Sequence, residues 1–213
     1  MQITIIGAGN MAGGIATRAL TGKHTVRLID SDPAKAGALA GELRQRVPGA
    51  DVQDADSTAI GEADIVVLAL PYPAGQQVAE QYAAALSGKT LVDISNPVDL
   101  ATFDSLAVEP GTSAAEQIAA AAPSAHVVKA FNTTFAGNLV AGAAGGATLD
   151  VFVAGDDATA KNLVTELASS GGLRPIDAGP LKRARELEGF QFLHMTLQET
   201  LGANWLSAIK ILL

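Results

Sequence analysis

The residues that most clearly suggest chemistry are three small residues near the start of the chain, Gly7, Gly9 and Ala12. They form the pattern G-x-G-x-x-A directly after an apolar, β-branched run from Ile3 to Ile6. In a dinucleotide-binding turn the first glycine permits the bend, the second admits a pyrophosphate to the backbone, and the third small residue lets the helix pack on the strand. Amide groups at the helix start then face the phosphates. The same pattern is also compatible with a plain strand-to-helix turn.

An acidic residue stands where such a turn needs one. Asp30 follows a second apolar run, Thr25 to Ile29, and lies 23 positions after Gly7. A carboxylate about 20 residues beyond the glycine turn accepts hydrogen bonds from the adenosine ribose. The alternative is that Asp30 caps the helix that follows. The glycine pattern and Asp30 together predict an NAD(P)-binding site.

Alternating strand and helix patterns continue along the rest of the chain. Strands are expected at residues 3–6, 25–29, 50–54, 64–70, 89–94, 126–130, 149–154 and 173–177, and helices at 10–20, 33–46, 57–63, 74–86, 113–122, 157–170 and from 181 to the end, with breaks at Gly189 and Gly202. This order predicts an α/β fold: a Rossmann-type, doubly wound, mostly parallel sheet with a C-terminal helical segment. We expect residues 1–178 to form the NAD(P)-binding domain. Residues 179–213 are expected to complete a second-substrate cleft.

Ligands of such sheets bind at the carboxyl ends of the strands. In this chain these ends are residues 7–11, 30–32, 70–73, 95–98 and 132–134. The irregular connection from residue 98 to 112 is longer than usual, which favours a functional role.

Three features at the strand ends have more than one interpretation. Tyr72 lies between Pro71 and Pro73, and its ring is expected either to project over the nicotinamide or to anchor a surface loop. Residues 132–134 offer hydrogen-bonding groups to a cofactor, or bond their own backbone in a turn. Lys129 either mimics the catalytic lysine of hydroxyacid dehydrogenases or is a solvated strand-end lysine, and the second is expected because nothing near it in the sequence completes such a site.

The composition excludes several classes of protein. The chain has 22 Asp and Glu against 14 Lys and Arg, a net charge of −8, which disfavours nucleic acid or an anionic membrane as partner. It has no cysteine, which excludes disulfides, thiolate metal sites and a cysteine nucleophile. Its three histidines lack metal-ligand spacing, so no metal site is predicted. Because the first residues enter a strand directly and no apolar stretch suits a membrane span, we expect a cytoplasmic protein.

Three motifs carry a resemblance to a known family. They are residues 7–11 (Gly-Ala-Gly-Asn-Met), residues 129–133 (Lys-Ala-Phe-Asn-Thr), and residues 177–181 (Asp-Ala-Gly-Pro-Leu) followed by Ala184 and Arg185. Over nearly its whole length the chain resembles the NADP-dependent reductases of the 8-hydroxy-5-deazaflavin coenzyme, coenzyme F420. It also resembles the cytosolic oxidoreductase domains of membrane ferric reductases and, more distantly, pyrroline-5-carboxylate reductase. The first motif is common to many dehydrogenases, and the other two are more specific.

The resemblance implies hydride transfer between a nicotinamide dinucleotide and a deazaflavin or flavin. Such a step needs two flat rings aligned at about 3–3.5 Å more than it needs an acid or base, and no catalytic residue is identified. The implied contacts of the nicotinamide cofactor are Gly9, Asn10, Met11, Leu70, Pro71, Asn96 and Pro97. The second cofactor is implied near the loop of Asn132 and Thr133 and near the C-terminal segment.

One departure from the family concerns cofactor choice. Members that use NADP carry Ser-Arg after the second strand, where this chain has Asp30 and Ser31. A carboxylate at this place favours a free 2′-hydroxyl and repels a phosphate, and Lys35 and Lys23 compensate only partly. We therefore expect NADH to be preferred or at least tolerated.

The sequence also allows two alternative functions, and it predicts a homodimer. The chain is alternatively an NAD(P)H-dependent reductase of a small imine or carbonyl compound, which needs a proton donor in the cleft. A dinucleotide-sensing domain without turnover is the alternative from another class. The apolar end of the chain, Ile209 to Leu213, predicts burial against another subunit and hence a homodimer.

Overall fold

A central eight-stranded sheet organises the chain, and the computed structural model describes it over residues 1–212. The spatial order of the sheet is β10-β9-β6-β5-β4-β1-β2-β3, and β7 and β8 form a separate hairpin. The strands are β1 Gln2–Ile6, β2 Thr25–Ile29, β3 Val52–Asp54, β4 Ile65–Leu68, β5 Thr90–Asp93, β6 His126–Lys129, β7 Ala143–Ala144, β8 Ala147–Thr148, β9 Asp150–Gly155 and β10 Arg174–Gly179.

The directions of the strands decide which of their ends meet. From β3 to β6 every neighbouring pair is parallel. The pairing of β6 with β9 is antiparallel, and β10 runs parallel to β9. The carboxyl ends of β2, β1, β4, β5 and β6 therefore lie side by side at one edge, whereas β9 and β10 end at the opposite edge. The predicted mostly parallel, doubly wound Rossmann-type sheet is confirmed.

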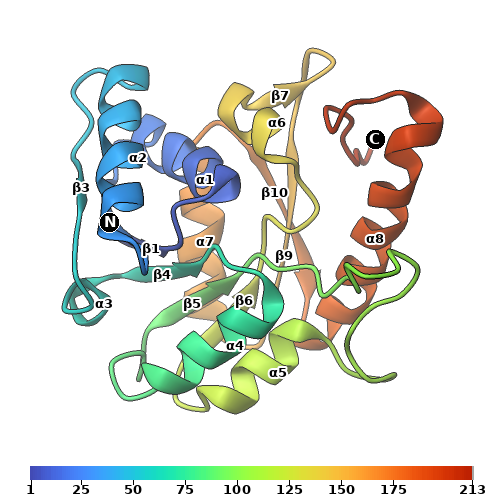
Figure 1. The fold of residues 1–213 in the computed structure, drawn as a ribbon, viewed down its shortest axis with the longest axis horizontal. Helices are drawn as coiled ribbons and strands as arrows, with labels where there is room; N and C mark the ends of the chain where they lie inside the picture. The colour runs from blue at the N-terminus through green and yellow to red at the C-terminus, as the bar shows by residue number, and fades with distance from the viewer. Residues whose placement is uncertain (213) are drawn as a thin grey trace.

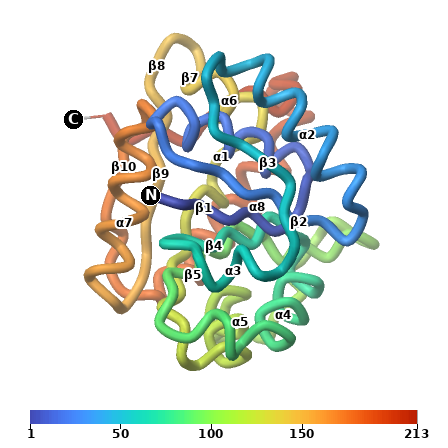
Figure 2. The backbone as a smooth tube through the Cα atoms, turned by 90° about the vertical axis from the view of Figure 1, so that its left-hand side faces the viewer, coloured from blue at the N-terminus to red at the C-terminus, as the bar shows by residue number. Residues whose placement is uncertain are grey.

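Helices cover both faces of this sheet, as Figures 1 and 2 show. The helices are α1 Asn10–Thr21, α2 Pro33–Arg46, α3 Ala59–Glu62, α4 Tyr72–Gln81, α5 Ala114–Ala121, α6 Ala136–Ala141, α7 Ala158–Ser170 and α8 Ala184–Leu201, with a short 3₁₀ turn at Leu181–Arg183. Side chains of α1, α2, α6 and α7 pack with Ile3 and Ile5 of β1 in one core cluster. On the other face Ile6 and Val66 pack with α3, α4 and α5. Because both faces are covered, the central strands are buried and mostly apolar, with Asp93 and Lys129 as the charged exceptions.

Two parts of the structure were not expected from the sequence. The first is α6 with the β7–β8 hairpin, a short Gly- and Ala-rich stretch without a clear periodic pattern. Helix α6 crosses α1 so closely that a side chain on Gly14 would come within 2.8 Å of the Leu139 side chain. Its position is therefore decided by packing against α1.

The second difference lies in the C-terminal segment. Helix α8 runs through Gly189 without a break, because a glycine in a helix costs only about 1 kcal/mol and packing offsets it. The predicted break at Gly202 is confirmed, since this residue ends the helix in the left-handed conformation, at φ 57°. Residues 203–212 form no helix but fold back along α6 and β9. Leu213 lies outside the described residues.

No helix within residues 1–212 is both long enough and apolar enough to cross a lipid bilayer.

Candidate functional site

The glycine turn joins β1 to α1 at the edge where five strands end. Gly7 donates its N–H to the carbonyl of Ile29 at 2.7 Å and has a φ of 108°, and a side chain on it would overlap the carbonyl of Ala69. Gly9 is the N-cap of α1, and no side chain caps this helix. A methyl group on Gly9 would meet no atom within 4 Å. The amides at the start of α1 therefore face open space, which is what a diphosphate group requires.

Asp30 lies directly against this turn. Its Oδ2 accepts the Ala8 N–H at 2.9 Å, and its Oδ1 accepts the Asp32 N–H at 3.0 Å. The N-cap of α2 is Asp32, which accepts the Ala34 N–H at 3.0 Å, so the capping alternative for Asp30 is wrong. The Ser31 hydroxyl also donates to Oδ1 at 3.4 Å, so three of the about four acceptor positions of the carboxylate are used and one remains. Ser31 is exposed beside it.

A cavity of about 480 Å³ opens beside the glycine turn, between α1, α2 and α6. Its walls include Gly9 and Asn10 of the turn, Ala136 and Gly137 of α6, and the charged residues Lys35, Glu42 and Arg46 of α2. Two cationic side chains of α2, Lys35 and Arg46, therefore line the same cavity as the start of α1. The sequence did not indicate this cavity, because one of its walls is α6.

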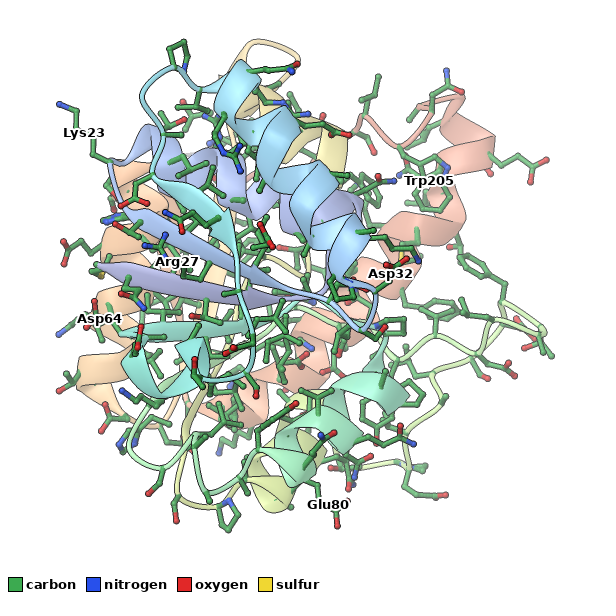
Figure 3. The ribbon with its side chains drawn as sticks, turned by 60° about the vertical axis from the view of Figure 1, so that its left-hand side comes forward. Lys23, Arg27, Asp32, Asp64, Glu80 and Trp205 are labelled. Atoms are coloured by element: carbon green, nitrogen blue, oxygen red, sulfur yellow. The ribbon has the colours of Figure 1, made fainter. Side chains whose placement is uncertain are left out.

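Lys23 has no part in this site. It precedes β2 at the amino end of that strand, whereas Asp32 follows the carboxyl end. Figure 3 shows the two residues at opposite sides of the molecule. The expectation that Lys23 helps to compensate for Asp30 is therefore wrong.

The next strand end contributes Leu70, Pro71 and Tyr72. The side chain of Leu70 lies next to Gly7, and Pro71 is the N-cap of α4. Tyr72 is the first residue of α4 and is half-buried. Burial raises the pKa of its phenol, and the negative charges of Glu188 and Asp93 raise it further. This interaction puts Tyr72 near the strand ends, which favours the cleft position over that of a surface anchor.

The ends of β5 and β6 are joined by a pair of side-chain amides. Asn96 Nδ2 donates to the Asn132 carbonyl at 2.9 Å, and Asn132 Nδ2 donates to Asn96 Oδ1 at 3.0 Å. Asn132 Nδ2 also lies 3.2 Å from the carbonyl of Leu187 in α8. Pro97 is buried next to this pair, and Met11 is half-buried in the first turn of α1.

Three buried side-chain oxygen atoms at these two strand ends have no hydrogen-bond partner within the described part of the chain. They are Ser95 Oγ, Asn132 Oδ1 and Thr133 Oγ1. Buried polar atoms in native proteins are almost always paired. A partner from outside the described chain is therefore expected for these three atoms. Thr134 differs, because its hydroxyl donates to the Phe131 carbonyl at 2.7 Å. The alternative of a turn bonded to its own backbone therefore holds for Thr134 alone.

Lys129 is fully buried, so the expectation of a solvated lysine is wrong. Its Nζ lies 2.7 Å from Asp93 Oδ2, 2.6 Å from the Ser95 carbonyl and 2.7 Å from Glu188 Oε1. An ammonium group has three N–H donors, and three acceptors surround this one. The one signal in the sequence for this buried ion pair was the position of Asp93 and Lys129 within otherwise apolar strands.

Glu188 brings α8 into the site. Its carboxylate accepts the Ala114 N–H at 3.0 Å and the Ala115 N–H at 3.3 Å, at the start of α5. Burial raises the pKa of Glu188, while Lys129 and the Ala114 amide act in the opposite direction. The ammonium of Lys129 and the two amides stabilise the ionised form of this carboxylate and so oppose the effect of burial. The sequence analysis missed Glu188 and Asp93, whereas Ser95 lies in the predicted strand end 95–98.

The fold and these strand ends define the chain as a Rossmann-type α/β protein. A family model described as NADP oxidoreductase, coenzyme F420-dependent, matches residues 2–97. The F420-dependent NADP reductase of Methanocaldococcus jannaschii is 30% identical over 197 residues, which cover 88% of this chain and 88% of that protein. The chain belongs to the F420-dependent NADP reductase family, a family of oxidoreductases.

Two further relatives show the extent of the similarity. A crystal structure from Arthrobacter sp. FB24, provisionally described as an F420-dependent NADP reductase, is 31% identical, covers 100% of both chains and has a TM-score of 0.84. Metalloreductase STEAP3 of Rattus norvegicus is 31% identical over 190 residues. These residues are 88% of this chain but 36% of that protein, so the chain spans about a third of the metalloreductase.

Proposed function

We propose that this chain transfers a hydride between a nicotinamide dinucleotide and a deazaflavin. The family supports this reaction, since its named members are F420-dependent NADP reductases. The observation that carries it in this chain is the open start of α1 beside Asp30. The two cofactors supply the redox chemistry, and the protein supplies binding and alignment.

The residues proposed to hold the dinucleotide follow the strand order. Asp30 lies at β2, Gly7 and Gly9 at β1, Leu70 at β4, Asn96 at β5 and Asn132 at β6. Four strand spacings of about 4.8 Å separate the first from the last, roughly 19 Å in all. An elongated ligand laid across this edge would have its ribose at Asp30, its diphosphate at α1 and its nicotinamide near Asn96 and Asn132. The unpartnered oxygens of Ser95, Asn132 and Thr133 lie at this last end.

The C-terminal segment, residues 179–213, is proposed to shape the cleft for the second cofactor. Figure 1 shows α8 standing beside the strand ends, together with the long loop before α5. Phe103 of this loop packs edge-on against Phe192 of α8, with ring centroids 6.3 Å apart. Phe103 is partly exposed, and Leu100 of the same loop is largely exposed. Exposed apolar side chains of this kind suit a flat aromatic ring.

A steady-state assay tests the reaction. NADH and NADPH oxidation is followed with coenzyme F420, FAD, FMN and a panel of cyclic imines as acceptors. Turnover with the deazaflavin well above that with the other acceptors is expected. Turnover with imines alone would contradict the proposal, and tight nucleotide binding without turnover would indicate a sensor.

The position of Asp30 supports a proposal about the nucleotide. Its carboxylate lies where the adenosine ribose is expected, and Ser31 next to it carries no positive charge. We infer that NADH is accepted, although the relatives are named for NADP. A preference for NADPH of a hundredfold in kcat/KM would contradict this inference.

One observation favours the second candidate, reduction of a small imine or carbonyl. This chemistry needs a proton donor, and Tyr72 supplies a phenol at the start of α4, beside the strand ends. A phenol is protonated at neutral pH and can donate a hydrogen bond, although its raised pKa makes Tyr72 a weaker acid than a free phenol. The imine arm of the assay decides between the two reactions.

A second copy of the chain is the proposed partner. Phe190, Leu193, Leu197 and Leu201 are 44%, 55%, 39% and 61% exposed and follow one stripe of α8. Spacings of three and four residues place side chains on the same helix face. Such a stripe can pair with its own copy across a two-fold axis. The chain is therefore expected to form a homodimer through α8.

A further inference from the structure

The cluster of Asp93, Lys129 and Glu188 holds more negative than positive charge. All three side chains are buried, with exposures of 1%, 0% and 1%. One ammonium faces two carboxyl groups, so the cluster carries a net charge of −1 when both are ionised. Burying a charge without a full counter-charge is costly unless hydrogen bonds satisfy it. The amides of Ala114 and Ala115 satisfy the second carboxylate, but they leave the net charge in place.

This charge lies directly behind the proposed nicotinamide end of the site. Lys129 binds the carbonyl of Ser95, the residue before Asn96. Leu187, the neighbour of Glu188, accepts a hydrogen bond from Asn132. The cluster is thus linked to Asn96 through the preceding residue, Ser95, and to Asn132 through Leu187, which is adjacent to Glu188. The field reaches the cleft, because the two carboxylates contribute to the raised pKa of Tyr72.

The lining of this end has the same character. Ser95 Oγ, Asn132 Oδ1 and Thr133 Oγ1 are buried and unpartnered. Asn132 Oδ1 is purely an acceptor and contributes partial negative charge, whereas the hydroxyls of Ser95 and Thr133 can also donate. Both the lining and the cluster behind it favour a positively charged ligand.

We propose that the Asp93–Lys129–Glu188 cluster is a fixed negative charge that makes the site favour the oxidised nicotinamide ring over the reduced ring. The inference rests on the proposed function, which places the nicotinamide at this edge. Loss of a hydride, one proton with two electrons, turns the neutral dihydronicotinamide into a cation, and the second cofactor takes up the hydride. A unit charge close behind the ring, in a medium of effective dielectric about 20, changes relative binding by a factor on the order of ten. The cluster thereby promotes hydride donation from the reduced nucleotide.

The test compares the affinities of the two redox forms. Dissociation constants of NAD⁺ and NADH, and of NADP⁺ and NADPH, are measured by calorimetry for the wild type and for Glu188→Gln. The substitution removes one negative charge and keeps the shape of the side chain. The ratio of the oxidised to the reduced dissociation constant is expected to rise at least about fivefold. A merely structural loosening would weaken both forms alike and leave this ratio unchanged.

Two matched variants separate charge from structure. Lys129→Met combined with Glu188→Gln disturbs the cluster more but keeps its net charge at −1, so the ratio should stay near that of the wild type. Glu116→Gln removes an acid that pairs with Arg185 at the surface, and it should also leave the ratio unchanged. If Glu188→Gln does not fold, Asp93→Asn makes the same charge change and should shift the ratio in the same direction.

The outcomes distinguish this inference from the proposed function. A wild type that binds both redox forms, with a ratio unchanged within twofold in Glu188→Gln, would overturn the inference alone. Binding of neither form by the wild type would overturn the inference and the proposed function together.

Discussion

The backbone amide of Ala8 donates a 2.9 Å hydrogen bond to the carboxylate of Asp30, a residue 22 positions later in the sequence. This bond ties the end of β2 to the glycine turn after β1. It fixes an acid beside the site proposed for the ribose and diphosphate, and it leaves the carboxylate free to accept a further hydrogen bond. Cofactor choice in this chain is therefore expected to depend on one residue and its neighbour.

Replacing Asp30 and Ser31 together by Ser and Arg should change the preferred nucleotide. The double variant removes a negative charge and adds a guanidinium that can bind a phosphate through two hydrogen bonds. The ratio of kcat/KM for NADPH to that for NADH is expected to rise at least about tenfold, as measured in steady state. Lys23→Ala is the control, because Lys23 lies at the other end of β2. An unchanged ratio in the double variant would remove Asp30 from the cofactor site.

The two glycines of the turn should respond differently to alanine. Gly7→Ala forces a side chain into a φ of 108° and against the carbonyl of Ala69, so it should lower the free energy of unfolding by about 2 kcal/mol or more. Gly9→Ala adds a methyl group in open space at a φ of −85°, so stability should change little. Nucleotide affinity of Gly9→Ala should nevertheless fall at least about tenfold, because the methyl group occupies the path of the diphosphate. Urea unfolding and calorimetry measure the two effects, and an unchanged affinity of Gly9→Ala would contradict the proposed site.

Asp150 should make stability depend on acid pH. Burial alone would raise the pKa of Asp150, but hydrogen bonds from Arg174, Lys210 and the Ile211 amide outweigh it and lower the pKa to about 2 from its ordinary value of 3.8. The lowered pKa stabilises the folded chain by about 2 kcal/mol. This stabilisation is complete well above pH 3.8 and is lost as the pH falls toward 2. Asp150→Asn should therefore be less stable than the wild type at pH 7, with a difference that shrinks below pH 4.

The matched control for this measurement is Asp177→Asn. Asp177 pairs with Lys161 but is 67% exposed, and exposed ion pairs contribute roughly 0–1 kcal/mol. Urea unfolding between pH 2 and 7 compares both variants with the wild type. Equal, pH-independent losses in the two variants would show that Asp150 does not anchor the C-terminal tail electrostatically.

A charge on the exposed stripe of α8 should separate the subunits. Leu193→Glu places a carboxylate in the proposed apolar interface, where burying it without a partner is unfavourable. Sedimentation at micromolar concentration should show a dimer for the wild type and a monomer for this variant. Glu199→Lys is the control, since Glu199 is exposed on the same helix but lies two residues from both Leu197 and Leu201 and hence off the stripe. A monomeric wild type would contradict the homodimer.

Local pattern was sufficient for the parts of the chain that short-range physics decides. Apolar β-branched runs predicted the central strands, and Asp32 with Pro33 predicted the start of α2. The glycine turn and Asp30 were also visible, because their spacing reflects one strand–helix–strand unit. The rule that parallel strands present their carboxyl ends at one edge predicted that Asn96 and Asn132 lie at the same edge, but the hydrogen bonds between them appear only in the structure.

Only the tertiary structure decided what long-range contacts determine. Lys129 was expected in solvent, yet its partners lie 36 residues before it in β5 and far beyond it in α8. The reversal of β9 and the place of α6 depend on pairing and close packing with distant elements. The unpartnered oxygens of Ser95 and Thr133 likewise emerge only once every neighbour is in place. A sequence reports the preference of each residue for its own conformation, whereas burial and charge pairing depend on which segments meet.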